Sequence, residues 1–139
     1  MDPIYTAEAL STGDGRSGHV STSDNSLSID LAPPKEMGGS GEGNNPEQLF
    51  AAGYAACFHS ALQMVAKSAK KDLGDSAVGA QVSIGKEGEG FGLSVILEAV
   101  IPNLPEDEAR ELVEQAHQVC PYSNATRGNI EVELRVTDE

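Results

Sequence analysis

Apolar residues recur at two different spacings along the chain, and the first third carries the short segments typical of strands. Ile4–Ser11, Gly18–Ser23 and Leu27–Leu31 contain β-branched residues and are separated by turn residues. Gly13–Gly15 supplies the first turn, and Asn25 lies in the second, where asparagine tolerates the positive φ of a tight hairpin. These signals predict a three-stranded antiparallel meander.

A long helix is predicted after a loop at residues 32–44. Asn45 fits the N-cap, Pro46 the first helical position, and Glu47 places an anion in the positive first turn. The helix is expected to run from Pro46 to about Lys70. Its first half is apolar on nearly every side, which is typical of a helix buried all round.

The rest of the chain is predicted to contain two strands joined by a hairpin, a second helix and a closing strand. In chain order these are Ala77–Lys86, Glu87–Gly90, Phe91–Ile101, Leu104 to about Val119, and Asn129–Val136. Pro121 is expected to end the second helix, because the residue before a proline is pushed out of helical geometry. The order βββ-α-ββ-α-β predicts an α+β fold, formed by one domain over residues 1–139.

Composition and charge narrow the classes of partner. The 139 residues carry 22 acidic and 9 basic side chains, a net charge of −13, which disfavours nucleic acid and anionic membranes. No N-terminal stretch resembles a signal peptide, and no apolar stretch is expected to approach the roughly 20 residues of a membrane helix. We therefore predict a cytoplasmic protein. Aromatic residues make up only 4%, so a partner subunit is expected to help bury apolar area.

The two cysteines, Cys57 and Cys120, form neither a C-x-x-C pair nor a zinc pattern with the scattered His19, His59 and His117. Each cysteine taken alone is more typical of a small core residue. In the cytoplasm, however, a disulfide is more often transient and catalytic than structural. We therefore predict no metal site and no structural bridge.

Four side chains together suit the chemistry of a peroxide-reducing thiol. A thiol attacks a peroxide as the thiolate, and a free cysteine with a pKa of ~8.5 is mostly protonated at neutral pH. Arg16, in a loop bracketed by glycines, can lower the pKa of Cys57, and Glu47 can hold that guanidinium. A second cysteine such as Cys120 can then condense with the sulfenic acid and protect it from further oxidation.

Two long motifs carry a family resemblance over essentially the whole chain. NPEQLFAAGYAACF at residues 45–58 and VCPYSNATRGNI at residues 119–130 resemble the two cysteine motifs of the organic hydroperoxide resistance (Ohr) proteins. The opening Tyr5–Ala7 and the glycine loop around Arg16 also match. The second motif is absent from the sister OsmC group. Glu42, Asn44 and Asn25 depart from the pattern, where Gly, Thr and Gly are expected, which affects loop conformation rather than chemistry.

The resemblance implies a thiol-dependent peroxidase that reduces organic and fatty-acid hydroperoxides to alcohols. It implies that Cys57 is the peroxidatic residue, that Cys120 resolves its sulfenic acid as a disulfide, and that Arg16 with Glu47 activates the thiol. It also implies regeneration by dihydrolipoamide on a lipoylated protein, an intertwined homodimer, and no cofactor.

The spacing of Glu47 and Cys57 restricts how they can meet. Ten residues on one helix separate two side chains by ~15 Å along the axis and about 80° in rotation. Either the helix breaks near Gly53, or the Glu47 beside Cys57 belongs to the other chain of a dimer. The small residues of the helix favour the second arrangement, and we predict composite sites at the dimer interface.

Apolar residues near Cys57 predict the walls of a substrate site. They are Met37, Leu49, Phe50, Tyr54 and Phe58. Such walls suit an alkyl or acyl chain better than hydrogen peroxide.

Two other functions remain open from the residues alone. One is a cysteine hydrolase that pairs Cys57 with a histidine, although His59 lies two residues away and cannot face it on a helix. The other is a small dimer that binds a hydrophobic ligand and whose buried cysteines are inert.

Overall fold

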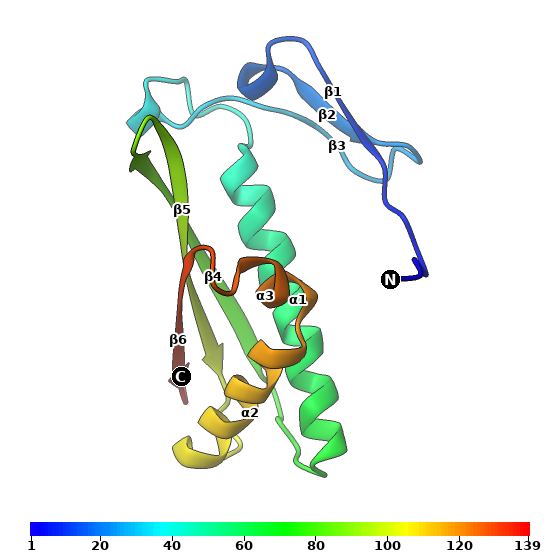
Figure 1. Cartoon of the computed structure of the whole chain (residues 1–139), viewed down its shortest axis with the longest axis vertical. Coiled ribbons are helices and arrows are strands. Elements are labelled where there is room, and N and C mark those ends of the chain that lie inside the picture. The colour runs from blue at the N-terminus through cyan, green and yellow to red at the C-terminus, as the bar shows by residue number, and fades with distance from the viewer. The chain divides into compact units, whose positions relative to one another are not determined.

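The computed structural model describes all 139 residues, which form two compact units, residues 1–49 and 50–139. The elements, in chain order, are β1 (Ala9–Thr12), β2 (His19–Thr22), β3 (Ser28–Asp30), α1 (Pro46–Ser68), β4 (Ala77–Glu87), β5 (Gly90–Val100), α2 (Glu106–Val119), α3 (Pro121–Thr126) and β6 (Glu131–Thr137) (Figure 1). Short 3₁₀ turns lie at Gly15–Ser17 and Lys35–Met37. The predicted α+β order is confirmed, and the short helix α3 is added to it. That the whole chain is one domain stays a prediction.

The first unit is the predicted meander. β1 pairs with β2 and β2 with β3, both antiparallel. Asn25 adopts a φ of 60° in the second turn, as the hairpin prediction required. The first strand is shorter than predicted, because its pairing with β2 begins only at Ala9.

Reciprocal hydrogen bonds at Asn45 and Gln48 fix the start of α1. The Asn45 side-chain oxygen accepts the Gln48 backbone N–H at 2.8 Å, and the Gln48 side chain accepts the Asn45 N–H at 3.0 Å. This capping box confirms the predicted N-terminus of the helix. Asn44, one of the departures from the family pattern, donates its side-chain N–H to the same Gln48 oxygen at 3.0 Å. Its side chain therefore reinforces the cap.

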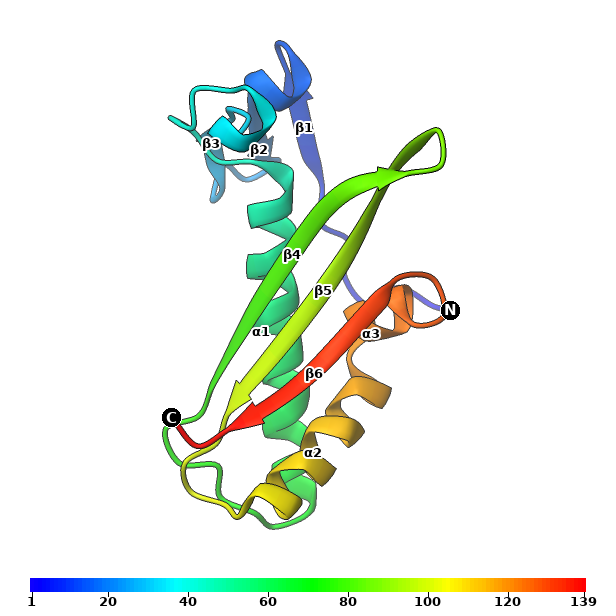
Figure 2. The ribbon, with the colours of Figure 1, turned by 90° about the vertical axis from the view of Figure 1, so that its left-hand side faces the viewer.

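The second unit is a three-stranded sheet covered on one face by helices (Figure 2). β4 and β5 form a long antiparallel hairpin, and β6 adds to β5 in parallel. A parallel neighbour needs a crossover, which α2 and α3 supply. Side chains alternate along β4 and β6 between partly buried positions, such as Val82 and Leu134, and exposed ones, such as Gln81 and Glu133. One face of the sheet is therefore apolar, and α1 and α2 pack on it.

The core of this unit lies between that face and the two helices. Its fully buried side chains are mostly aliphatic, and they include Phe58, Leu62, Val95, Leu97, Ile101, Val113 and Ala116. No tryptophan is present, so many medium-sized side chains supply the buried area.

The expectation that α1 is buried all round is wrong for a single chain. Five of its side chains are buried, whereas Ala52, Ala56 and Ser60 are exposed along a stripe with helical spacing. By length and composition α1 is also apolar enough to cross a membrane, contrary to the sequence expectation, because an 18-residue window of it has a mean hydropathy of 1.3. Only 28% of that apolar window is buried in the chain itself. Much of α1 stays exposed because the sheet and α2 cover only one side of the helix.

Substitution of a buried side chain on α1 tests this packing. Leu62 has no exposed surface, so Leu62→Ala should lower the free energy of unfolding by about 2–5 kcal/mol, from lost transfer energy and the cavity left behind. Chemical denaturation measures the change. Gln63→Ala, on the exposed side of the same helix, should change it by less than about 0.5 kcal/mol. Equal effects of the two variants would contradict the assigned faces.

Candidate functional site

The two cysteines lie side by side although 63 residues separate them. Cys57 is half-buried on α1, and Cys120 is fully buried between α2 and α3. Their Sγ atoms are 3.6 Å apart and both thiols are free. A disulfide has an S–S length of about 2.05 Å, so an oxidant could join the two sulfurs after a movement of about 1.5 Å.

The position of Cys120 depends on the proline that follows it. Cys120 has extended backbone angles, φ −66° and ψ 124°, and ends α2, as the sequence predicted. The same Pro121 then occupies the first position of α3, where its missing N–H costs nothing. The sequence interpretation missed α3, and the preference of proline for a first helical position was the available signal.

The groups around Cys57 do not favour its thiolate. Burial raises the pKa of Cys57 above its ordinary value, because a charge is poorly solvated there. The backbone N–H of Tyr122 donates to the sulfur and lowers that pKa in part, while neighbouring Cys120 raises it. A reactive thiolate at neutral pH therefore needs a further positive charge.

Arg16 and Glu47 form an ion pair within the first unit. Arg16 Nη1 lies 3.0 Å from Glu47 Oε2, to which it donates a hydrogen bond, and 2.9 Å from Oε1. Glu47 is only 13% exposed, whereas Arg16 is 41% exposed. Because one terminal nitrogen faces the carboxylate, the Nη2 and Nε donors of the guanidinium remain available to another group.

Close backbone contact explains why glycine is needed in the loop around Arg16. A Cβ atom at Gly18 would lie 2.1 Å from the carbonyl oxygen of Thr12, so no other residue fits without movement of the chain. Arg16 itself sits in the 3₁₀ turn Gly15–Ser17. The loop therefore gives the Arg16 backbone a defined conformation, and the ion pair with Glu47 orients its guanidinium.

The five predicted substrate-wall residues occupy different surroundings. Tyr54 and Phe58 are fully buried in the core, and Phe50 packs against it. Met37, 43% exposed, and the half-buried Leu49 belong to the first unit. The wall role of all five stays a prediction.

Tyr122 is an aromatic neighbour that the sequence interpretation missed. Its ring centroid is 5.6 Å from that of Tyr54 and 6.2 Å from that of Phe50. Phe50 and Tyr54 are themselves 6.1 Å apart, and the three rings form one cluster. Its proximity to Cys57 could have been inferred from its place two residues after Cys120.

A buried polar network secures α3, and it too was missed. The Tyr54 hydroxyl hydrogen-bonds to the hydroxyls of Ser123, at 2.8 Å, and Thr126, at 3.0 Å. His117 Nδ1 hydrogen-bonds to Ser123 Oγ at 2.8 Å. Burial, with a smaller effect of Arg127, lowers the pKa of His117, which favours its neutral form. All members are satisfied, so the network stabilises one position of α3.

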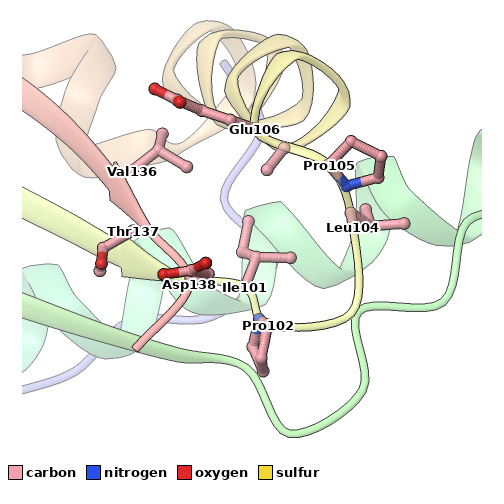
Figure 3. Close-up of a pocket in the computed structure, with 9 residues that line it drawn as sticks. Ile101, Pro102, Leu104, Pro105, Glu106, Val136, Thr137 and Asp138 are labelled. Atoms are coloured by element: carbon pink, nitrogen blue, oxygen red, sulfur yellow. The ribbon is translucent and has the colours of Figure 1, made fainter.

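A separate cavity of about 310 Å³ opens where α2 begins and β6 ends (Figure 3). Its lining combines aliphatic side chains with two carboxylates and includes Ile101, Leu104, Val136, Glu106 and Asp138. None of the nine predicted site residues lines it, so it is distinct from the pair of thiols.

Comparisons with known proteins match most of the chain. The sequence model of the OsmC-like proteins matches residues 39–135. An organic hydroperoxide resistance protein of Xanthomonas axonopodis pv. citri is 51% identical over 133 residues, covering 94% of this chain and 93% of that protein.

Solved structures are similar over the same length. The crystal structure of an organic hydroperoxide resistance protein from Elizabethkingia anophelis has a TM-score of 0.94 at 53% identity and covers 100% of both chains. That of the organic hydroperoxide resistance protein OhrB of Bacillus subtilis has a TM-score of 0.88 at 43% identity, over 97% of this chain and 100% of that chain.

The distance between the sulfurs predicts rapid closure of a disulfide inside one chain. A mild thiol oxidant such as diamide should form a Cys57–Cys120 disulfide, because the two sulfurs lie 3.6 Å apart. The denatured chain should then contain no free thiol, and its mass should be lower by two hydrogen atoms. Mass spectrometry and a non-reducing gel check this. Cys120→Ser, with Cys57 left alone, should form no such bridge. A covalent link between two wild-type chains would contradict the geometry.

Proposed function

The chain belongs to the OsmC-like family, in its organic hydroperoxide resistance branch, and we propose that it is a thiol-dependent peroxidase that reduces organic and fatty-acid hydroperoxides to alcohols. The observation that carries the proposal is the pair of free sulfurs of Cys57 and Cys120, 3.6 Å apart. Two thiols at this distance can exchange between dithiol and disulfide.

The proposed cycle has three steps. The Cys57 thiolate attacks the outer peroxide oxygen, the O–O bond breaks, and the leaving alkoxide takes a proton to become the alcohol. The Cys120 thiol then attacks the sulfur of the Cys57 sulfenic acid, and the hydroxyl leaves as water with the thiol proton. A dithiol, dihydrolipoamide on a lipoylated protein, reduces the disulfide by exchange and is itself oxidised to lipoamide.

Arg16 and Glu47 have the proposed role of activating Cys57. Burial opposes ionisation of the thiol, and a guanidinium beside it would reverse that effect. Glu47 holds Nη1 of Arg16, which leaves two further donor groups to bind the peroxide oxygens.

The proposed sites are composite and belong to a homodimer. α1 is continuous from Pro46 to Ser68, so the alternative that it breaks near Gly53 is wrong. Glu47 and Cys57 of one chain are then ~15 Å apart along the helix axis. The Arg16–Glu47 pair beside each Cys57 is therefore assigned to the second copy. The exposed stripe of Ala52 and Ala56 supports close approach of that copy to α1.

The accessible members of the aromatic cluster, the partly buried Phe50 and the exposed Tyr122, support an organic substrate. Apolar walls bind an alkyl or acyl chain by removing it from water, and hydrogen peroxide gains nothing from them. The cytoplasmic location and the lipoylated reductant stay predictions.

Hydrogen bonds of the histidines disfavour a cysteine hydrolase. His59 Nε2 hydrogen-bonds to Ser76 and His117 to Ser123, and His19 bonds to Asp30 and Ser28. No imidazole thus forms a hydrogen bond to Cys57, as the base of such an enzyme would.

Steady-state kinetics with different peroxides tests the function. With dihydrolipoamide as reductant, kcat/KM should be at least about tenfold higher for cumene or linoleic hydroperoxide than for hydrogen peroxide, because apolar burial contributes only to the former. Cys57→Ser should abolish consumption of all three. Equal values for the three peroxides would argue against an organic substrate, and full activity of Cys57→Ser would rule out the thiol mechanism.

Mixed dimers test the composite sites. Cys57→Ser chains, inactive alone, and Glu47→Gln chains, weakly active alone, should together reach about a quarter of wild-type activity when refolded at equal concentration, because half of the dimers then contain one intact site. Peroxide consumption measures the recovery.

The matched control is a mixture of Cys57→Ser with Cys120→Ser. Its activity should not exceed the mean of the two variants measured separately, because both thiols of a site lie in the same chain and mixing restores no site. Absence of recovery in the first mixture would mean that each site takes Glu47 from its own chain.

A further inference from the structure

Gly53 interrupts the apolar run of α1 one turn before Cys57. A glycine inside a helix costs about 1 kcal/mol relative to alanine, so its presence calls for a reason. A Cβ atom here would lie 2.8 Å from the Tyr122 hydroxyl oxygen and 3.2 Å from the Cε2 atom of its ring. The missing side chain therefore provides the space in which the Tyr122 ring lies against α1.

The next residue of α1 holds the other side of the same segment. The Tyr54 hydroxyl bonds to both Ser123 and Thr126, which follow Tyr122 in α3. Consecutive residues, Gly53 and Tyr54, thus fix the ring of Tyr122 and the hydroxyls of α3. Two different contacts, one steric and one polar, thus hold α3 against α1.

The segment held in this way carries one of the sulfurs. Cys120 precedes Tyr122 by two residues, and its Sγ is 3.6 Å from that of Cys57. The backbone N–H of Tyr122 donates to Cys57 Sγ, which lowers the pKa of that thiol in part. Because Gly53 and Cys57 are four residues apart, they lie on one face of α1. The Tyr122 ring, which lies against Gly53, and the Cys57 sulfur are therefore neighbours on α1.

We propose that Tyr122, seated on Gly53, is a positioning residue that keeps Cys120 within reach of Cys57 during the resolving step. This inference rests on the proposed function. In that step the Cys57 sulfur forms a bond to the Cys120 sulfur, the S–O bond of the sulfenic acid breaks, and the hydroxyl leaves as water with the Cys120 proton. A second peroxide competes for the same sulfenic acid and converts it to the sulfinic acid. Displacement of Tyr122 shifts this competition toward the sulfinic acid.

Four proteins separate the effect of the Tyr122 ring position from that of its hydroxyl. They are wild type, Gly53→Ala, Tyr122→Phe and the double variant Gly53→Ala/Tyr122→Phe. Each reduced protein is treated with increasing cumene hydroperoxide without reductant, and mass spectrometry gives the ratio of disulfide to Cys57 sulfinic acid. Gly53→Ala should raise the sulfinic fraction several-fold. Tyr122→Phe retains the ring and the N–H, so its ratio should stay near that of wild type.

The double variant is the rescue. It removes the hydroxyl that the new Cβ would meet at 2.8 Å and leaves ring carbons at 3.2 and 3.3 Å, a smaller overlap, so the ratio should return part of the way to that of wild type. Gly79→Ala is the matched control, because a Cβ at Gly79 meets nothing within 4 Å, and its ratio should be unchanged. Should Gly53→Ala fail to fold by circular dichroism, Tyr122→Ala, which removes the ring, should raise the sulfinic fraction instead.

A normal ratio in folded Gly53→Ala, or no recovery in the folded double variant, would overturn the positioning role. A wild-type protein that consumes no organic hydroperoxide would instead overturn the proposed function. The two failures are therefore distinguishable within one experiment.

Discussion

Packing of one face of α1 against the three-stranded sheet and α2 is the contact on which the arrangement of the second unit depends. It buries Phe58 and Leu62 and leaves Cys57 half-buried at the margin of the core. The end of α2 lies in the same core through Ala116, so Cys120 comes to the same margin. The two sulfurs meet because apolar burial fixes both helices, and no bond between the sulfurs is needed to bring them together.

Burial has an opposite effect on the chemistry. It holds the thiols in place and also raises the pKa of Cys57, which disfavours the thiolate that a peroxidase needs. The Tyr122 N–H offsets part of this effect. A guanidinium with free donors, such as that of Arg16 held by Glu47, has the charge to offset the remainder. In the proposed dimer the structural and electrostatic requirements are met by different chains.

Sequence predicted the features that depend on local patterns. The cap at Asn45, the positive φ of Asn25 and the element order follow from short-range chemistry, and all are confirmed. Strand ends depend on pairing partners distant in sequence, so β1 begins at Ala9 rather than at the predicted Ile4. The short helix α3 escaped prediction, since it is too short for a periodic signal and is held by Tyr54, a residue about 70 positions earlier. Burial of α1 was overestimated because composition cannot say how many chains cover a helix.

The apolar character of α1 thus serves two different purposes on its two sides. The side with large residues, such as Phe58 and Leu62, is buried in the core of its own chain, and a substitution there lowers the stability of the fold. The exposed side has small residues, Ala52 and Ala56, which contribute little to that core and permit a second backbone to approach. Gly53 lies between these sides, where Tyr122 needs space. Small residues in this helix are therefore explained by what must come close to it, rather than by helix propensity.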